Sequence, residues 1–312
     1  MRFDKIAVVG AGIMGHGIAQ IMAQGGKKVV LNDINQEILD KAKSKVAESL
    51  KMLVDNGMLD KTQADTAADM ISYTTDLDKI ADADLVFEVV PEKMPIKESI
   101  FGRLAGICKK DAVWATNTSG IPINTLAALT DRPELFVGAH FFQPAHLVPL
   151  VEVIQGDKTK PEVITAMLEL LRAVGKSPVH VKIDIPGFIG NRLQHAIARE
   201  AMSLLQKGVA SAEDIDLVVK DSLAIRMVFT GPIQQRDFNG LDTHLSITEY
   251  LYKDLENSTE PLAILKDKVQ MGDLGLKTGK GFYDWSGGLA AQATAEKNQQ
   301  LIEIIKFLKN RA

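Results

Sequence analysis

Residues 6–15 read IAVVGAGIMG, and this stretch decides the fold of the first half of the chain. It opens on four consecutive apolar residues, a run typical of a strand that is buried on both faces. A glycine-rich turn follows at once, and apolar residues at helical spacing then continue to Gln24. A second apolar run at residues 28–32 ends at Asp33. Strand, glycine turn, helix and strand in this order predict a βαβ unit.

The glycine-rich turn has the spacing of a dinucleotide-binding motif. Its residues, all predicted to contact the cofactor, are Gly10, Ala11, Gly12, Ile13, Met14 and Gly15. Such a turn lets a pyrophosphate approach the backbone and lie at the helix N-terminus, where free N–H groups favour anions. Asp33 is placed to accept hydrogen bonds from the adenosine ribose, and it would repel a 2′-phosphate. Because no arginine follows it in the next two residues, the sequence predicts NAD rather than NADP.

Strand patterns alternate with helical patterns up to about residue 184. Further apolar runs lie at residues 71–74, 85–90, 112–116, 136–142, 148–154 and 179–182. After Ile185-Pro186-Gly187 only helical patterns remain, and the first of them is long and amphipathic. We therefore predict an α/β chain in two domains. Residues 1–184 form a Rossmann-type doubly wound sheet, and residues 185–312 form an all-α domain.

The run from residue 136 to 154, FVGAHFFQPAHLVPLVEVI, is typical of two strands joined by a short loop. His140 lies in the first strand and Glu152 in the second, each among apolar neighbours. A short connection can bring the two side chains together, and a carboxylate beside an imidazole fixes the tautomer of the ring. Either residue alone is more often structural, as a satisfied core histidine or a solvent-facing acid. Together they predict a general base that removes a hydroxyl proton.

Polar side chains follow several predicted strands, where ligands of doubly wound sheets bind. Glu92, Asn117 and Ser119 occupy such strand ends, and we expect contacts with a ligand there. Turn chemistry alone also explains an Asn-Thr-Ser triplet. Asn191, in the first turn of the long helix, is placed either to hydrogen-bond a substrate carbonyl or only to cap that helix.

Composition argues against several classes of partner. The chain of 312 residues has a net charge of -4 and a single cysteine, Cys108. The acidic balance argues against nucleic-acid or anionic-membrane binding, and no apolar run is long enough to span a membrane. With one cysteine and no signal-peptide pattern before the first strand, we expect a cytoplasmic protein that acts on a small molecule. The sequence predicts no metal site.

Eight motifs in order along the chain resemble those of the 3-hydroxyacyl-CoA dehydrogenase family. They are GAGIMG, VVLND, FEVVPE, NTSG, HFFQP, LVEVI, PGFIGNRL and LKTGKGFY. The resemblance implies NAD-dependent oxidation of a 3-hydroxyacyl-CoA, of the 3-hydroxybutyryl-CoA type in fatty acid metabolism, or the reverse reduction. It also implies a homodimer formed through the helical domain.

The resemblance further implies roles for individual residues. His140 would be the general base oriented by Glu152, while Ser119 and Asn191 would hold the substrate oxygens. Ser49 matches a position on the helix that meets CoA in the family. The residues predicted to contact the cofactor, besides the glycine-rich turn and Asp33, are Glu92, Lys97, Asn117, Ser119, Gln143 and Lys277.

The chain departs from the family pattern in three places. Gly120 replaces a second serine, Gln143 replaces the usual asparagine of HFFNP, and Asp55-Asn56 stand where lysines often meet CoA. The loss of cations near a phosphorylated nucleotide weakens the case for CoA.

The segment of residues 225–232 resembles a branch that acts on CoA-free substrates, including gulonate, carnitine and pyridine carboxylates. In this segment Arg226 is placed to pair with a substrate carboxylate, although a surface ion pair explains it equally well. A CoA-free hydroxy acid or hydroxymethyl compound is therefore the second candidate substrate. A third hypothesis is cofactor binding without turnover, as in the lens crystallins of the family.

Overall fold

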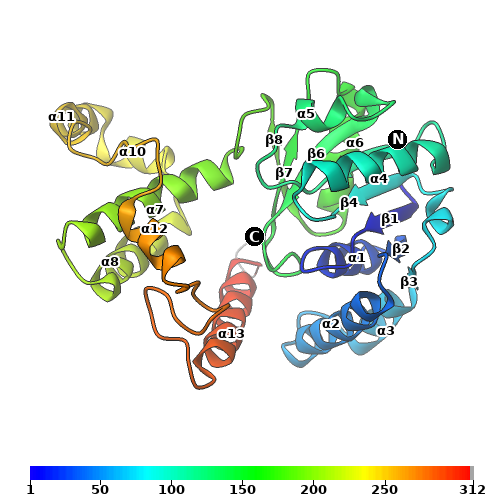
Figure 1. The fold of residues 1–312 in the computed structure, drawn as a ribbon, viewed down its shortest axis with the longest axis horizontal. Helices are drawn as coiled ribbons and strands as arrows, with labels where there is room; N and C mark the ends of the chain where they lie inside the picture. The colour runs from blue at the N-terminus through cyan, green and yellow to red at the C-terminus, as the bar shows by residue number, and fades with distance from the viewer. Residues whose placement is uncertain (310–312) are drawn as a thin grey trace. The chain divides into compact units, whose positions relative to one another are not determined.

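The computed structural model describes residues 1–309 and divides into two compact units (Figure 1). The first unit comprises residues 1–191 together with the chain from residue 300 onward, and the second comprises residues 192–299. The second unit begins later than the predicted helical domain, at residue 192 rather than 185, and it ends at residue 299, before the end of the last described helix.

The first unit is built on one eight-stranded sheet in the order β3-β2-β1-β4-β5-β6-β7-β8. The strands are β1 (Lys5–Val9), β2 (Lys28–Asn32), β3 (Ile71–Thr74), β4 (Leu85–Glu88), β5 (Val113–Thr116), β6 (Phe136–Phe141), β7 (Leu150–Ile154) and β8 (Ser177–Val181). Neighbouring strands are parallel except for β6 and β7, which are antiparallel. The predicted α/β class with a doubly wound, mainly parallel sheet is confirmed.

Helices cover both faces of this sheet. They are α1 (Gly15–Gln24), α2 (Gln36–Asp55), α3 (Lys61–Asp69), α4 (Met94–Ile107), α5 (Ile123–Ala127) and α6 (Pro161–Ala173). In β1 the side chains of Ile6 and Val8 join a core with α1, α2, α3 and α6, while Ala7 and Val9 join a second core with α4 and α5. This alternation explains why the strands are continuously apolar, since both of their faces are buried.

The second unit is helical. Its elements are α7 (Gly190–Gln206), which begins in the first unit, α8 (Ala212–Val218), a π-helical segment η3 (Val219–Ala224), α9 (Ile225–Met227), α10 (Gln234–Asn239), α11 (Leu241–Leu251), α12 (Ala263–Gln270) and the first part of α13 (Leu289–Lys309). Isolated bridges near residues 275–284 are the only β-structure in the described chain beyond residue 191. None of the described helices combines the length and apolar character that crossing a membrane requires.

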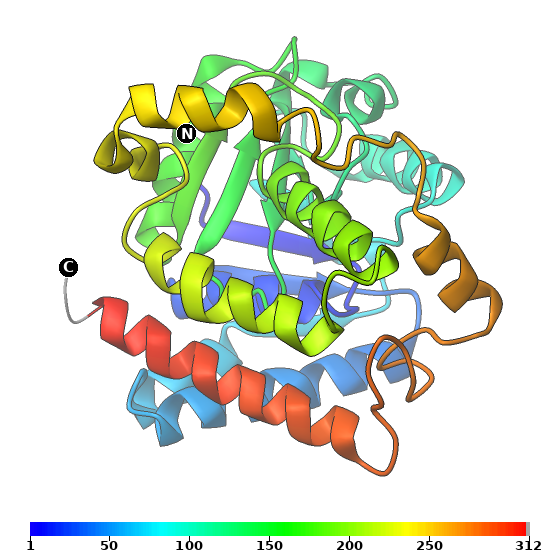
Figure 2. The same ribbon diagram turned by 90° about the vertical axis from the view of Figure 1, so that its left-hand side faces the viewer.

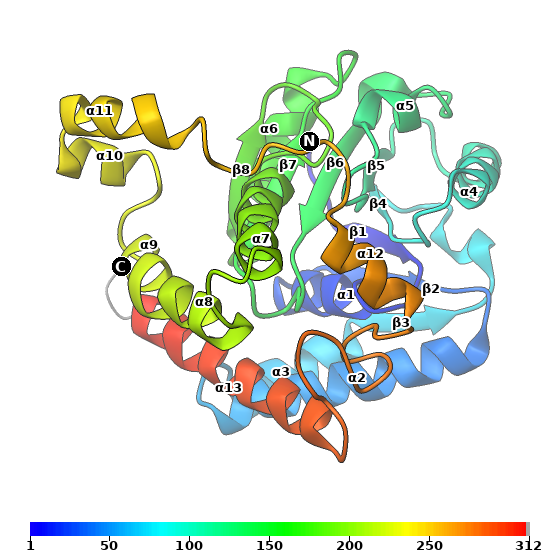
Figure 3. The same ribbon diagram turned by 60° about the vertical axis from the view of Figure 1, so that its left-hand side comes forward.

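The last turns of α13 return to the first unit. Ile302 and Ile305 are buried and form a small apolar cluster with Leu53 of α2 and Leu147. Figures 2 and 3 show the end of this helix running beside α2. The apolar face of α13 therefore belongs to the core of the first unit at these residues.

Candidate active site

His140 and Glu152 face each other across the antiparallel pair of β6 and β7. His140 Nδ1 lies 2.9 Å from Glu152 Oε2, and both side chains are almost completely buried. The antiparallel register explains the meeting, because residues directly opposite each other point to the same face of the sheet. The structure therefore brings together the pair on which the predicted general base depends.

Glu152 holds the imidazole and also anchors the start of α7. Its Oε1 atom accepts hydrogen bonds from the backbone N–H groups of Ile189 and Gly190, at 2.9 and 2.8 Å. Burial alone would raise the pKa of Glu152, but the hydrogen bonds from His140 and from these two amides outweigh it and lower the pKa. A charged Glu152 accepts a proton-bearing Nδ1, which leaves Nε2 of His140 as the acceptor for a substrate proton.

Two aromatic rings enclose the imidazole. The ring centroids of Phe142 and Phe188 lie 4.5 and 5.7 Å from that of His140. Phe188 is fully buried and has a φ of 51°, a left-handed conformation that is rare for a bulky residue and that clusters at functional sites. A Cβ at Gly190 would lie 2.5 Å from the Phe142 ring, so glycine at this position lets the ring lie close to the helix start. Sequence reasoning missed Phe188, whose only local signal is its place between Gly187 and the helix start.

The glycine-rich turn after β1 has the shape that a dinucleotide requires. A Cβ at Gly10 would lie 2.6 Å from the Val89 carbonyl oxygen, whereas one at Gly12 would meet no protein atom within 4 Å. The backbone at Gly12 therefore faces open space, as the approach of a pyrophosphate demands. Asp33 Oδ2 accepts a hydrogen bond from Ala11 N–H at 2.8 Å, which fixes the carboxylate beside the turn.

A cavity of about 530 Å³ adjoins this turn and has the size and lining for an adenosine group. Asp33 lies in its wall together with Gly10, and its mainly apolar lining includes Ile34, Val90 and Pro91. Arg103 of α4 also lines it, which the sequence did not reveal because the residue lies 70 positions after Asp33. The residues present thus fit a bound NAD.

The predicted ligand-binding residues at the strand ends form one hydrogen-bonded loop system. Glu92 Oε1 accepts hydrogen bonds from Thr118 Oγ1 and, at 3.0 Å, from Ser119 N–H. Burial would raise the pKa of Glu92, but these hydrogen bonds and the charge of Lys97 hold it below its usual value. Asn191 Nδ2 donates to the Ser119 carbonyl at 2.6 Å. The two residues predicted to hold the substrate oxygens are therefore neighbours.

Two predicted cofactor contacts have other partners. Asn117 Oδ1 accepts the Phe141 N–H at 2.9 Å, so this amide fixes the end of β6. Lys97 is 1% exposed, and its Nζ atom contacts both Glu88 oxygens at 2.9 Å and Glu92 Oε2 at 3.2 Å. With three acceptors around three N–H groups, Lys97 has no exposed donor to offer a cofactor. Lys97 thus belongs to a buried ion network, and the cofactor contact implied by the family resemblance stays a prediction.

The remaining predicted residues lie elsewhere. Ser49 is 7% exposed, and its hydroxyl has no hydrogen-bond partner among the described residues. Gln143 is exposed and precedes a cis proline. Lys277 and Arg226 belong to the second unit, where the Arg226 guanidinium donates to the carbonyl and hydroxyl of Ser222. No group of three or more metal-ligating acids, histidines or cysteines occurs in the described residues.

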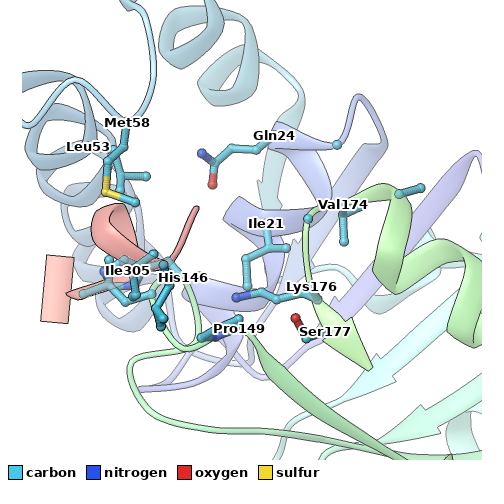
Figure 4. Close-up of a pocket in the computed structure, with 15 residues that line it drawn as sticks. Ile21, Gln24, Leu53, Met58, His146, Pro149, Val174, Lys176, Ser177 and Ile305 are labelled. Atoms are coloured by element: carbon cyan, nitrogen blue, oxygen red, sulfur yellow. The ribbon is translucent and has the colours of Figure 1, made fainter. Parts of the chain in front are cut away.

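A second cavity of about 460 Å³ lies where α1, α2, the 142–149 loop and the end of α13 meet (Figure 4). Its walls are mainly apolar, with contributions from Ile21, Leu53 and Ile305. His146 also lines it, and burial together with the nearby charges of His16 and Lys176 lowers the pKa of His146 to about 4. This histidine is therefore neutral near pH 7 and is held within the fold.

Comparison with known proteins identifies the family. Residues 5–185 match the model for the NAD binding domain of 3-hydroxyacyl-CoA dehydrogenase, and residues 187–285 match the model for its C-terminal domain. The chain belongs to the 3-hydroxyacyl-CoA dehydrogenase family. It is thus an NAD-dependent dehydrogenase that acts on a CH–OH group, as predicted.

The relatives that match the chain are named for two classes of substrate, acyl-CoA thioesters and a pyridine carboxylate. A probable 3-hydroxybutyryl-CoA dehydrogenase of Deinococcus radiodurans is 41% identical over 282 residues, covering 90% of this chain and 100% of the relative. The 5-formyl-3-hydroxy-2-methylpyridine 4-carboxylate 5-dehydrogenase of Mesorhizobium japonicum is 33% identical over 308 residues, covering 98% and 99%.

Solved structures divide in the same way. A 5-formyl-3-hydroxy-2-methylpyridine 4-carboxylic acid 5-dehydrogenase, described as an NAD+-dependent dismutase, superposes with a TM-score of 0.93 at 32% identity over 99% of both chains. The (S)-3-hydroxybutyryl-CoA dehydrogenase of Ralstonia eutropha gives a TM-score of 0.77 at 36% identity, over 92% of this chain and 100% of that one.

Proposed function

We propose that this chain oxidises a substrate CH–OH group, or reduces the corresponding carbonyl, with His140 as the general acid and base. The observation that carries the proposal is the buried pair of His140 and Glu152, which orients Nε2 as a proton acceptor. Bound NAD supplies the hydride acceptor. Nε2 of His140 takes the hydroxyl proton, and charged Glu152 stabilises the imidazolium that forms. In the reverse direction the imidazolium returns that proton to the carbonyl oxygen.

Ser119 and Asn191 are proposed to position the substrate. Their hydrogen bond links the loop after β5 to the first turn of α7. Both the Ser119 hydroxyl and the Asn191 amide can donate to a substrate oxygen, and such donors hold the reacting carbon in one orientation. In this proposal the glycine-rich turn and Asp33 bind the cofactor, and Lys277 and Arg226 remain proposed contacts from the second unit.

Of the two candidate substrate classes, the structure favours one without CoA. In the family, CoA meets α2 near residues 54–56. In this chain Asp55 of that turn pairs with Lys51 at 2.5 Å, and the Asn56 amide donates to the Met52 carbonyl. Leu53 is covered by the end of α13. The turn therefore presents an acid and an amide, and its neighbouring cation, Lys51, is already paired with Asp55 rather than free for a phosphorylated nucleotide.

Two further observations support a CoA-free substrate. Ser49, the remaining match to the CoA position, is buried within α2 rather than available to a ligand. The relative named for a pyridine carboxylate matches nearly the whole chain, including the region of α13, whereas the 3-hydroxybutyryl-CoA relative covers 90% of it. We propose a small hydroxy acid or hydroxymethyl compound as substrate. The 41% identity to the CoA-dependent relative keeps a 3-hydroxyacyl-CoA as the second candidate.

The deciding experiment is NADH oxidation by the purified chain with two kinds of probe. Acetoacetyl-CoA represents the thioesters, and the free probes are acetoacetate, other short keto acids and 5-formyl-3-hydroxy-2-methylpyridine 4-carboxylate. We expect kcat/KM for at least one free acid to exceed that for acetoacetyl-CoA. A higher kcat/KM for acetoacetyl-CoA would select the thioester instead. No turnover with any probe would support cofactor binding without catalysis.

We also propose that the chain forms a homodimer through its helical unit and acts in the cytoplasm. Large apolar side chains are exposed in the second unit, among them Leu217, Val218, Ile233 and Leu245. Exposed apolar surface of this kind is typical of a subunit interface. Light scattering during size-exclusion chromatography should give twice the chain mass of 34.0 kDa, and a monomer at micromolar concentration would contradict the proposal.

A further inference from the structure

We infer that Lys97 and Glu88 are positioning residues that hold Ser119 in place through Glu92. The inference rests on the proposed role of Ser119 in binding substrate. It assigns Lys97 an indirect role in place of a cofactor contact, and it gives a role to Glu88, which sequence reasoning passed over.

Glu88, the last residue of β4, is the centre of this network and is completely buried. Its Oε1 atom accepts hydrogen bonds from Lys97 Nζ and from the Val90 N–H, both at 2.9 Å. Its Oε2 atom accepts from Lys97 Nζ at 2.9 Å and from Thr116 Oγ1 at 2.6 Å. The carboxylate therefore ties the ends of β4 and β5 to α4 at the edge of the sheet that carries the cofactor turn.

Lys97 extends the network from this buried centre to the surface. Its Nζ atom also lies 3.2 Å from Glu92 Oε2, and the Glu92 side chain is 39% exposed. The other Glu92 oxygen accepts from Thr118 Oγ1 and from the Ser119 N–H. Ser119 in turn accepts the Asn191 amide at its carbonyl. A continuous chain of polar contacts thus connects a buried ammonium to both proposed substrate-holding residues.

The energetics favour a geometric role over a purely stabilising one. An ion pair removed from water contributes little net stability, because the cost of desolvation offsets the Coulomb attraction. Here two carboxylates share one ammonium, and the hydroxyls of Thr116 and Thr118 satisfy the remaining lone pairs. In this arrangement every charged group of the network has a partner. The network can therefore hold the loop that carries Ser119 in one position.

The test removes the network without leaving a buried charge unpaired. In the double variant Glu88→Gln/Lys97→Met, both buried charges disappear together. The matched control is Asp84→Asn/Lys109→Met. It removes the 2.5 Å ion pair of Asp84, which directly precedes β4 and so lies at the end of the strand opposite Glu88. Both double variants break a charged link between β4 and the chain of α4 or just after it, and the control tests whether the loss of such a link alone changes the Ser119 loop.

Besides the melting temperature, three measurements are made on both double variants and the native chain. They are the NADH dissociation constant from nicotinamide fluorescence, amide hydrogen exchange of residues 117–121, and kcat with whichever probe the native chain turns over. For Glu88→Gln/Lys97→Met we expect exchange to rise about tenfold or more and kcat to fall about 30- to 100-fold. The NADH dissociation constant should stay within about threefold of the native value, and the control variant should match the native chain in all three.

Two results would overturn the inference. A rise in the NADH dissociation constant of more than about tenfold with kcat unchanged would show that Lys97 contacts the cofactor. Unchanged exchange at residues 117–121 with only a lower melting temperature would reduce the network to a structural role. If the native chain turns over no probe, the proposed function fails, and the exchange measurement still decides whether this network holds the Ser119 loop.

Discussion

His140 Nδ1 and Glu152 Oε2 meet at 2.9 Å between two adjacent antiparallel strands, and the other oxygen of Glu152 binds the backbone that starts α7. One carboxylate therefore sets the tautomer of the proposed base and the position of the helix that carries Asn191. Because Asn191 directly follows Gly190, any shift of Glu152 moves both the base and a proposed substrate contact.

Replacing Glu152 with Gln should reverse the polarity of this contact. The amide oxygen can still accept the N–H groups of Ile189 and Gly190, so the fold should persist. The amide nitrogen, however, donates to His140 Nδ1 and forces the ring proton onto Nε2. We expect kcat to fall by about two to four decades with NADH affinity unchanged. A variant with native kcat would show that the orientation of the ring is not set by Glu152.

The same substitution changes the dependence of stability on acid. The pKa of folded Glu152 lies below its ordinary value of 4.5, so its ionised form stabilises the fold above that pH. This stabilisation is lost as the pH falls through the lower, folded pKa. Urea unfolding is measured at steps of about 0.5 pH units between pH 5 and 3. Over this range the free energy of unfolding should fall more steeply for the native chain than for Glu152→Gln. Parallel curves would contradict the assignment.

Replacing Gly190 with Ala should disturb the ring that packs against the proposed base. The added Cβ would lie 2.5 Å from the Phe142 ring, so that ring must shift from its contact with His140. We expect kcat to fall by about tenfold or more, since small displacements at a reacting centre cost this much. The matched control is Gly106→Ala in α4, where an added Cβ meets nothing within 4 Å. That control should keep native kcat; equal losses in both variants would exclude a local cause.

Replacing Asp33 with Ala should relax the choice of cofactor. The carboxylate lines the proposed adenosine cavity and would repel a 2′-phosphate. We expect the ratio of kcat/KM for NAD to that for NADP to fall at least about tenfold, equivalent to about 1.4 kcal/mol. Ala11 loses its hydrogen-bond acceptor in this variant, so melting temperature is measured as well. Equal use of both cofactors by the native chain would contradict the role of Asp33.

His146 should make the protein less stable as the pH falls, at higher pH values than those at which Glu152 acts. Its pKa drops from 6.5 to about 4 on folding, so the unfolded chain binds the proton more readily between these values. The free energy of unfolding should therefore fall by up to about 3 kcal/mol as the pH is lowered from 6.5 to 4. In His146→Gln this slope should be largely absent. Urea unfolding at several pH values measures it, and identical slopes would exclude His146 as the source.

The sheet and the contact between His140 and Glu152 were predictable because both depend on local patterns. A buried strand, a glycine turn and a closing acid lie within 28 residues, and their physical requirements leave few alternatives. The contact of His140 with Glu152 follows from a short connection between two apolar runs, since such strands pair as antiparallel neighbours. Each inference needed only the sequence near the residue concerned.

The features that the sequence concealed depend on contacts between distant segments. The burial of Lys97 was not predicted, because charged side chains are usually exposed. Its partner Glu88 lies in a different element, among apolar residues, so the local sequence did not show the pairing. The return of Ile302 to α2 joins residues about 250 positions apart, beyond the reach of any periodic pattern. Phe188 was hidden for a related reason, because its ring packs near His140, which lies in a distant strand of the sequence.

The most direct test of the whole account is the variant His140→Gln, measured with the probe that the native chain turns over best. Glutamine can still occupy the site beside Glu152 but cannot accept a proton from a hydroxyl group at neutral pH. We predict that kcat falls by about two to four decades while the NADH dissociation constant remains that of the native chain. Unchanged turnover in His140→Gln would contradict the account.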